Sequence, residues 1–226
     1  MGRRGSGYGS EDHFIRYRLD DSNVLDSYVK AVLPHAGGIT WLYPAQGVAE
    51  EPKDLAFIHL TEEQLRQWNA FWPNPGNRSW DGIASCDGEW LLFEAKANEN
   101  ELCSPGTNAS PRSLQQITKA LEEVKLFLGI PSATVWHQRY YQYANRLAVL
   151  YFLNVVAHIP ARLIFVYFIG DVFPDGRPCP QTEQVWRLLI SKCHAELGLP
   201  ERHRLSDRMH EVFIPVRISS KSDAMI

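Results

Sequence analysis

The most informative pattern of apolar positions lies between Trp80 and Ala97, where the chain reads WDGIASCDGEWLLFEAKA. Two apolar runs flank the dipeptide Asp87-Gly88. Asp-Gly between two such runs is the strongest short-range signal of a β-hairpin. A two-residue turn at this dipeptide pairs Cys86 with Glu89 and fixes the register of both strands.

This register makes a prediction about three charged side chains. Paired residue numbers have a constant sum along an antiparallel ladder, so Asp81 is expected to face Glu94. Lys96 follows Glu94 by two residues, and side chains two apart in a strand point to the same face. We therefore expect two carboxylates and one ammonium group on one face of the hairpin.

The rest of the chain shows helical and strand patterns in alternation. Thr61 and Gln64 have the spacing of a capping box, and Ser110 followed by Pro111 is typical of a helix start. The predicted helices span Ser22–Leu33, Thr61–Phe71, Ser110–Leu128, Tyr140–His158 and Glu183–Leu197. The predicted strands are Ile39–Tyr43, Leu55–Leu60, Arg162–Ile169 and Glu211–Ile218, in addition to the hairpin.

The segment Arg162–Ile169 reads RLIFVYFI, a continuous apolar run typical of a strand buried on both faces. Helices separate it from the hairpin, which indicates a crossover connection and parallel pairing in one sheet. Asp171, just after this strand, is interpreted as a turn residue. The segment Asn98–Pro111 is rich in Asn, Ser, Pro and Gly, and we expect a loop there that closes over a substrate.

The helix Tyr140–His158 is apolar almost all round, which predicts that it is buried. Its first turns nevertheless carry Gln142, Asn145 and Arg146. Gln142 and Arg146 are four residues apart and share a helix face. Because buried polar groups need partners, these side chains serve either an active site with a bound phosphate or a structural hydrogen-bond network.

Two facing carboxylates favour a bound cation. Like charges directly across a ladder are destabilising, and a divalent ion compensates both. Carboxylate oxygens, a backbone carbonyl and waters are ligands that Mg²⁺ prefers, and a lysine beside them can orient or deprotonate a water. The alternative is a surface hairpin in which Lys96 only neutralises Glu94, a pair worth about 0–1 kcal/mol.

The stretch resembles the core motif of the PD-(D/E)XK nuclease superfamily, which has the restriction-endonuclease-like fold. Asp81 matches the first acidic residue of that motif, Glu94 the second and Lys96 the lysine. Trp80 stands where the family name has proline, a variable position. The resemblance implies metal binding by Asp81, Glu94 and the carbonyl of Ala95, with catalysis by the three charged side chains.

The resemblance also implies further roles and a fold. Helices similar to Tyr140–His158 contribute a Gln or basic residue near the metal in that family, so Gln142 and Arg146 are expected to bind substrate. The implied fold is α/β, with a mixed central sheet flanked by helices and an αβββαβ core with N- and C-terminal additions. The leading helix of the core is either the one near Ser22 or the one from Thr61.

We expect residues 1–12 to be disordered and residues 13–226 to form a single domain, with its core at about 61–170. If the helix from Thr61 leads the core, Glu62 or Glu63 adds an acidic group to the site. The four cysteines are widely spaced, which favours reduced thiols in a cytoplasmic protein.

Composition limits the functional classes. Apolar residues make up 45% and charged residues 22% of the chain, an ordinary globular balance. The net charge of −3 provides no strongly basic field for nucleic acid. The longest apolar run is too short to span a bilayer. We therefore expect no membrane partner, and either a monomer or a homodimer.

Two functions remain as predictions. The first is a nuclease that uses Mg²⁺ or Mn²⁺ to hydrolyse phosphodiester bonds in nucleic acid, with DNA favoured over RNA. The second is a non-catalytic module with the nuclease fold that binds a partner through its aromatic residues, which form 12% of the chain.

Overall fold

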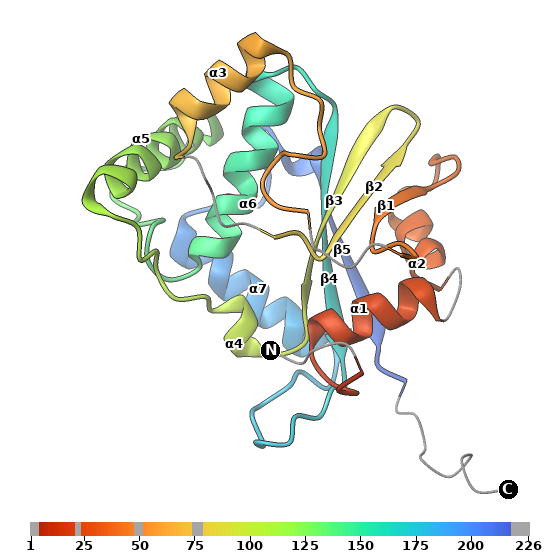
Figure 1. Ribbon diagram of the computed structural model, residues 1–226. Coiled ribbons are helices and arrows are strands. Elements are labelled where there is room, and N and C mark those ends of the chain that lie inside the picture. The colour runs from red at the N-terminus through yellow and green to blue at the C-terminus, as the bar shows by residue number, and fades with distance from the viewer. Residues whose placement is uncertain (1–4, 21–23, 48–51, 74–78, 218–226) are drawn as a thin grey trace, which may run out of the picture.

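The protein is built around one open, mixed β-sheet (Figure 1). The computed structural model describes residues 5–20, 24–47, 52–73 and 79–217. The sheet has the strand order β1-β2-β3-β4-β5; β1, β2 and β3 pair antiparallel, whereas β3, β4 and β5 pair parallel. The strands are β1 (Thr40–Tyr43), β2 (Gly82–Cys86), β3 (Glu89–Lys96), β4 (Ala161–Ile169) and β5 (Met209–Pro215). The predicted α/β class with a mixed, helix-flanked sheet is confirmed.

Helices cover both faces of this sheet (Figure 1). On one face lie α1 (Ser10–Leu19) and α2 (Val24–Val32). On the other face lie α3 (Glu62–Phe71), α5 (Pro111–Leu128), α6 (Tyr141–Tyr151) and α7 (Glu183–Leu197). Short helical turns complete the elements: α4 (Glu99–Leu102), the π-helical turn η1 (Phe152–Val156) that extends α6, and the 3₁₀ turn η2 (Ser206–Arg208).

The pleat of β3 decides which residues meet which helices. Leu91, Phe93 and Ala95 belong to the apolar cluster formed with α1 and α2. Leu92 belongs to the opposite cluster, formed with α5, α6 and α7. Because side chains alternate along a strand, Glu94 and Lys96 point toward the α6 face.

The predicted hairpin forms in the predicted register. Cys86 pairs with Glu89, and the ladder runs without a shift to Gly82 opposite Phe93. Asp87 and Gly88 both have positive φ angles, 50° and 81°, as a type I′ turn requires. The register prediction was correct because the two-residue turn at Asp87-Gly88 specifies it.

The buried crossover is also as expected. Residues Tyr143 to Leu153 of α6 and its extension are buried. The strand β4 is buried along most of its length and pairs parallel with β3, with Glu94 beside Phe165. The capping box of Thr61 and Gln64 and the Ser110 cap are present.

The predicted strand Leu55–Leu60 is absent, and the predicted loop Asn98–Pro111 is a loop only in part. Leu55–Leu60 forms turns and no ladder, and it is fixed by buried side chains of Leu55 and Ile58 and by a bond from Trp80 Nε1 to Asp54 O at 3.0 Å. The segment after β3 begins with the helical turn α4, because Asn98 accepts a capping hydrogen bond from the Glu101 amide at 3.2 Å. Apolar content alone does not distinguish such packed turns from strands.

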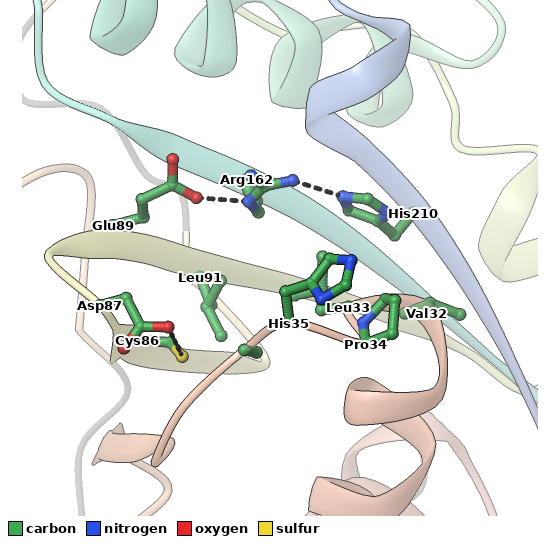
Figure 2. Close-up of a pocket in the computed structure, with 11 residues that line it drawn as sticks. Val32, Leu33, Pro34, His35, Cys86, Asp87, Glu89, Leu91, Arg162 and His210 are labelled. Carbon is green, nitrogen blue, oxygen red and sulfur yellow. Dashed lines mark hydrogen bonds and ion pairs between the residues drawn. The ribbon is translucent and has the colours of Figure 1, made fainter.

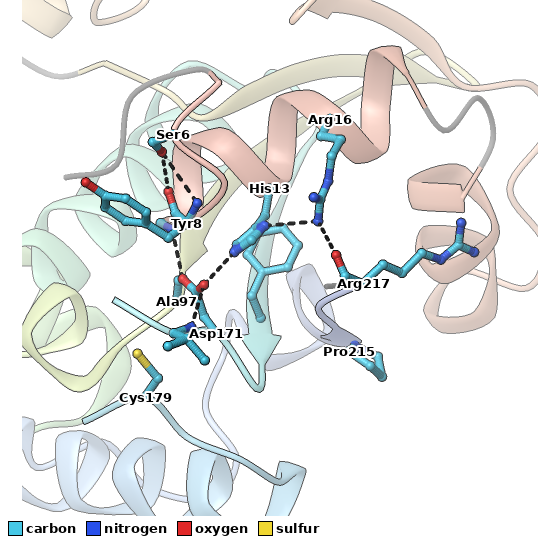
Figure 3. Close-up of polar contacts among 12 residues, drawn as sticks. Ser6, Tyr8, His13, Arg16, Ala97, Asp171, Cys179, Pro215 and Arg217 are labelled. Carbon is cyan, nitrogen blue, oxygen red and sulfur yellow. Dashed lines mark hydrogen bonds and ion pairs between the residues drawn. The ribbon is translucent and has the colours of Figure 1, made fainter. Parts of the chain in front are cut away.

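The expectation of a disordered N-terminus is wrong from Ser10 onward, where α1 begins. Asp171 anchors this helix (Figure 3): its carboxylate accepts the Gly9 amide at 2.8 Å and lies 2.9 Å from Nε2 of His13. Tyr17 donates to the Pro215 carbonyl at 2.8 Å. These partners are more than 150 residues away in sequence, so no local pattern indicates the helix; residues 1–4, Ser22 and Ile218 lie outside the described residues.

None of the helices in the described ranges is long and apolar enough to cross a membrane.

Candidate functional site

The predicted site residues gather where β3 extends past the start of β2. The β2–β3 ladder ends at Gly82 and Phe93, so Asp81 stands just before β2 at the position that faces Glu94. The Ala95 amide donates to Oδ2 of Asp81 at 2.8 Å. The carboxylate of Asp81 thus takes the place of the backbone carbonyl that would accept from the Ala95 amide if the β2–β3 ladder continued.

Glu94 lies between two cations. One carboxylate oxygen pairs with Nζ of Lys96, and the other, Oε2, accepts from Nε of Arg146 at 2.6 Å. Glu94, Lys96 and Arg146 are 1%, 4% and 3% exposed. Burial raises the pKa of Glu94, but Arg146 and Lys96 outweigh it and hold the pKa below its usual value.

This geometry contradicts the alternative in which Lys96 and Glu94 form a surface ion pair. Both side chains are buried, where removing one charge of a pair leaves the other uncompensated.

Helix α6 completes the polar cluster through its first two turns. Nζ of Lys96 donates to Oε1 of Gln142 at 2.9 Å. The backbone amide of Gln142 donates to Oγ of Ser104 at 2.9 Å, which links the start of α6 to the segment after α4. The predicted shared face of Gln142 and Arg146 is confirmed, since each contacts one of the charged residues of β3.

Arg146 is held on three sides. Its Nη2 donates to the Ser79 carbonyl at 2.6 Å, and its guanidinium carbon lies 4.2 Å from the ring centroid of Trp80. Its third nitrogen, Nη1, is buried and has no hydrogen-bond partner among the described residues. Sequence reasoning missed the contact with Trp80, because no local spacing relates the two positions.

The carboxyl group of Asp81 has a strongly shifted pKa. Burial of the group and the nearby charge of Glu94 raise its pKa from 3.8 to about 7, although Lys96, the Ala95 amide and Arg146 act in the opposite direction. A carboxyl group with a pKa near neutrality is typical of functional sites.

Two further buried polar groups without partners lie on or near this face. Tyr167 of β4 pairs in register with Lys96, and its hydroxyl has no hydrogen-bond partner in the described ranges. Nδ2 of Asn98 is likewise buried without a partner there. Native proteins leave few such groups unsatisfied, so each suggests a place for a water or a ligand.

The oxygen ligands available at the site are of the type that a hard divalent cation prefers. Asp81 and Glu94 supply carboxylate oxygens. The Ala95 carbonyl points to the same edge of β3 as its amide, because both groups of one strand residue face the same neighbour. Within the described ranges no group of three or more His, Cys, Asp or Glu residues is arranged to hold a metal ion. A site here therefore depends on two carboxylates, the carbonyl and waters.

Other candidates lie apart from the cluster. Glu62 and Glu63 are exposed, and Glu63 pairs with Arg66. All four cysteines are free.

A separate cavity of about 410 Å³ opens at the other end of β3, beside the turn of the hairpin (Figure 2). Glu89 forms part of its wall and pairs with Arg162 and with Arg208, the latter at 2.5 Å. Nη1 of Arg162 lies 3.2 Å from Nε2 of His210 (Figure 2). Glu89 and Glu94 are five residues apart, roughly 16 Å along the strand, so this cavity is distinct from the predicted site.

The chain matches no protein-family model, and the searches of curated proteins and of solved structures find no similar protein.

Proposed function

We propose that the protein is a divalent-metal-dependent nuclease that hydrolyses phosphodiester bonds, in DNA rather than RNA. The observation that carries the proposal is the convergence of Asp81, Glu94 and Lys96, from a hairpin, with Gln142 and Arg146, from a distant helix. A purely structural ion pair needs neither a second carboxylate with a pKa near 7 nor a buried guanidinium nitrogen without a partner.

Each residue has a role in this proposal. Asp81, Glu94 and the Ala95 carbonyl hold Mg²⁺ or Mn²⁺. The bound ion supplies Lewis-acid polarisation of the phosphoryl group and lowers the pKa of a coordinated water. Lys96 orients the attacking water, and Gln142 fixes the position of its Nζ. Arg146 steadies a phosphate oxygen through Nη1.

The order of elements supports a restriction-endonuclease-like core. In the chain, α2 precedes β1, β2 and β3, which are adjacent antiparallel strands, and α5 and α6 precede the parallel strand β4. This order corresponds to αβββαβ with α3 inserted between β1 and β2. In this proposal α2 is the leading helix, and the core begins near residue 24, earlier than the expected residue 61.

The second candidate is a non-catalytic module with the same fold. One observation favours it: two carboxylates face two cations, so the charges of Asp81, Glu94, Lys96 and Arg146 balance without a metal. Such a module would bind its partner elsewhere and retain the cluster for stability.

Metal titration separates the two candidates. Isothermal titration with Mn²⁺ and Mg²⁺ is expected to show binding by the wild type and its loss in Asp81→Ala. No heat of binding at millimolar metal, with or without an oxyanion such as sulfate present, would exclude the nuclease. A panel of labelled single- and double-stranded DNA and RNA, with Lys96→Ala as the control, then identifies the substrate. Cleavage that survives in Lys96→Ala would point to a contaminating enzyme.

A further inference from the structure

Arg146 forms an ion pair with one of the two carboxylate oxygens through which Glu94 would bind a metal. Its Nε lies 2.6 Å from Oε2 of Glu94, while Lys96 pairs with the other oxygen. A divalent cation at Glu94 therefore meets a positive charge at hydrogen-bond distance. At an effective dielectric constant near 20, one such charge changes metal affinity by more than roughly tenfold.

Arg146 also has a free binding capacity of its own. Nη1 is buried and has no acceptor among the described residues, although the side chain as a whole is 3% exposed. The guanidinium carbon lies 4.2 Å from the ring centroid of Trp80, so the ring covers one face of the guanidinium. Its N–H groups therefore donate within a fixed plane. A planar guanidinium with a free nitrogen is suited to an oxyanion such as a phosphate.

We propose that Arg146 is a positioning residue that couples the two ligands of the site: it blocks Glu94 until a phosphate oxyanion draws it away. In this view the guanidinium stands in for the metal in the free protein. A phosphate then competes with Glu94 for the guanidinium, and Glu94 becomes available to the ion. The inference rests on the proposed function.

Linkage gives this coupling a measurable form. If an oxyanion raises the affinity for the metal by some factor, the metal must raise the affinity for the oxyanion by the same factor. The free protein should then bind metal weakly, and cleavage should require the metal and the substrate phosphate to bind together. Such coupling would keep a metal-loaded, reactive site from forming without substrate.

The test is Mn²⁺ binding, measured by calorimetry at pH 8 without nucleic acid. Arg146→Gln removes the competing charge and keeps a side-chain amide at about the position of Nε, where it can donate to Glu94. We expect it to bind Mn²⁺ at least about tenfold more tightly than the wild type. Arg146→Lys keeps the charge and should show much less tightening. Circular dichroism verifies that each variant is folded.

A matched control comes from the other end of β3. Glu89 also lies between two cations, Arg162 and Arg208. Arg162→Gln removes the same charge from an equivalent pair, roughly 16 Å along the strand from Glu94. Because this distance exceeds the Debye length of about 8 Å at physiological salt, it should leave Mn²⁺ affinity unchanged.

A second arm tests the effect of an oxyanion directly. Sulfate is an oxyanion that the protein cannot hydrolyse, and sodium chloride at equal ionic strength controls for screening. Sulfate should tighten Mn²⁺ binding by the wild type and have no such effect on Arg146→Gln.

The outcomes are distinct. Equal Mn²⁺ affinity in the wild type and Arg146→Gln, or equal tightening in Arg162→Gln, would overturn the coupling and leave the nuclease proposal standing. Equal Mn²⁺ affinity of the wild type with and without sulfate would also overturn the coupling. No Mn²⁺ binding by any variant would overturn the proposed function together with the inference.

Discussion

Nζ of Lys96 donates a hydrogen bond to Oε1 of Gln142 at 2.9 Å, which joins a residue of β3 to a residue of α6 that lies 46 positions away in the sequence. The same ammonium group pairs with Glu94. Lys96 is therefore held from two elements and is not a flexible surface lysine. Replacing it changes the stability of the fold as well as any chemistry.

Lys96→Met is expected to lower the free energy of unfolding by about 1–3 kcal/mol, because it leaves Gln142 and one oxygen of Glu94 without their partner. Arg146 still compensates the charge of Glu94, which limits the loss. Urea unfolding monitored by tryptophan fluorescence measures it. The exposed Lys192→Met is the control and should change stability by less than about 0.5 kcal/mol. Equal effects of the two substitutions would contradict a buried network.

Asp81 should make stability depend on pH in metal-free protein. Its folded pKa is about 7, above the ordinary 3.8, so the folded state binds the extra proton between these values. The contribution of Asp81 is therefore fully present below about pH 4 and is lost as the pH rises to about 7.

Asp81→Asn cannot ionise and should remove this dependence. In buffers with a chelator, we expect the variant to be more stable than the wild type at pH 8 and similar at pH 4. Urea titrations across this range give the comparison. A wild type and variant with parallel pH profiles would show that the carboxyl group of Asp81 titrates normally.

Gly82 should not tolerate a side chain. A Cβ atom at this position would lie 2.5 Å from the ring of Phe14 and 3.2 Å from Cβ of Phe93. Gly82→Ala therefore displaces the buried ring of Phe14, at a cost of about 1–3 kcal/mol. Gly38→Ala is the matched control, because a Cβ there meets no atom within 4 Å. Thermal unfolding of both variants tests the close approach; equal melting temperatures would contradict it.

The anchor of α1 should weaken in acid. Burial raises the pKa of Asp171, but His13 and the amides of Gly9 and Val172 outweigh it and hold the pKa below its ordinary value. Its stabilisation is therefore present above the unfolded pKa of about 3.9 and is lost as the pH falls through the lower folded value.

Asp171→Asn should lower stability at pH 7 by about 1–3 kcal/mol, since an amide cannot replace both carboxylate oxygens. It should also flatten the acid limb of the stability profile below about pH 4. Asp175→Asn, which affects an exposed pair with Arg177, provides the comparison. Identical acid limbs for the wild type and Asp171→Asn would exclude the anchor.

The sequence was sufficient where the determinants are local. The turn at Asp87-Gly88 specifies which residues of β2 and β3 are paired, and hence that Asp81 faces Glu94. The four-residue spacing of Gln142 and Arg146 specifies their common face. That this face meets Glu94 and Lys96 follows only from the packing of α6 on the sheet, which the periodicity of α6 cannot show.

Long-range contacts account for what the sequence did not indicate. The helix α1 has a Gly- and Ser-rich start, and its stability comes from Asp171 and Pro215. In the sequence, Trp80 is notable only as a departure from a family pattern, whereas in the structure it supports the guanidinium of Arg146. Asp171 was interpreted as a turn residue, and its carboxylate proves to join the start of α1 to the end of β4.

The backbone amide of Ala95 donates to a side chain, the carboxylate of Asp81, and not to a neighbouring strand. This makes the amide a spectroscopic reporter. Its proton is donated to Oδ2 of Asp81, an atom whose charge changes with protonation and with any bound cation. The chemical shift of this single amide should therefore follow the state of the carboxylate directly. One resonance in a nitrogen–proton correlation spectrum would then register an event at the site before any product is formed.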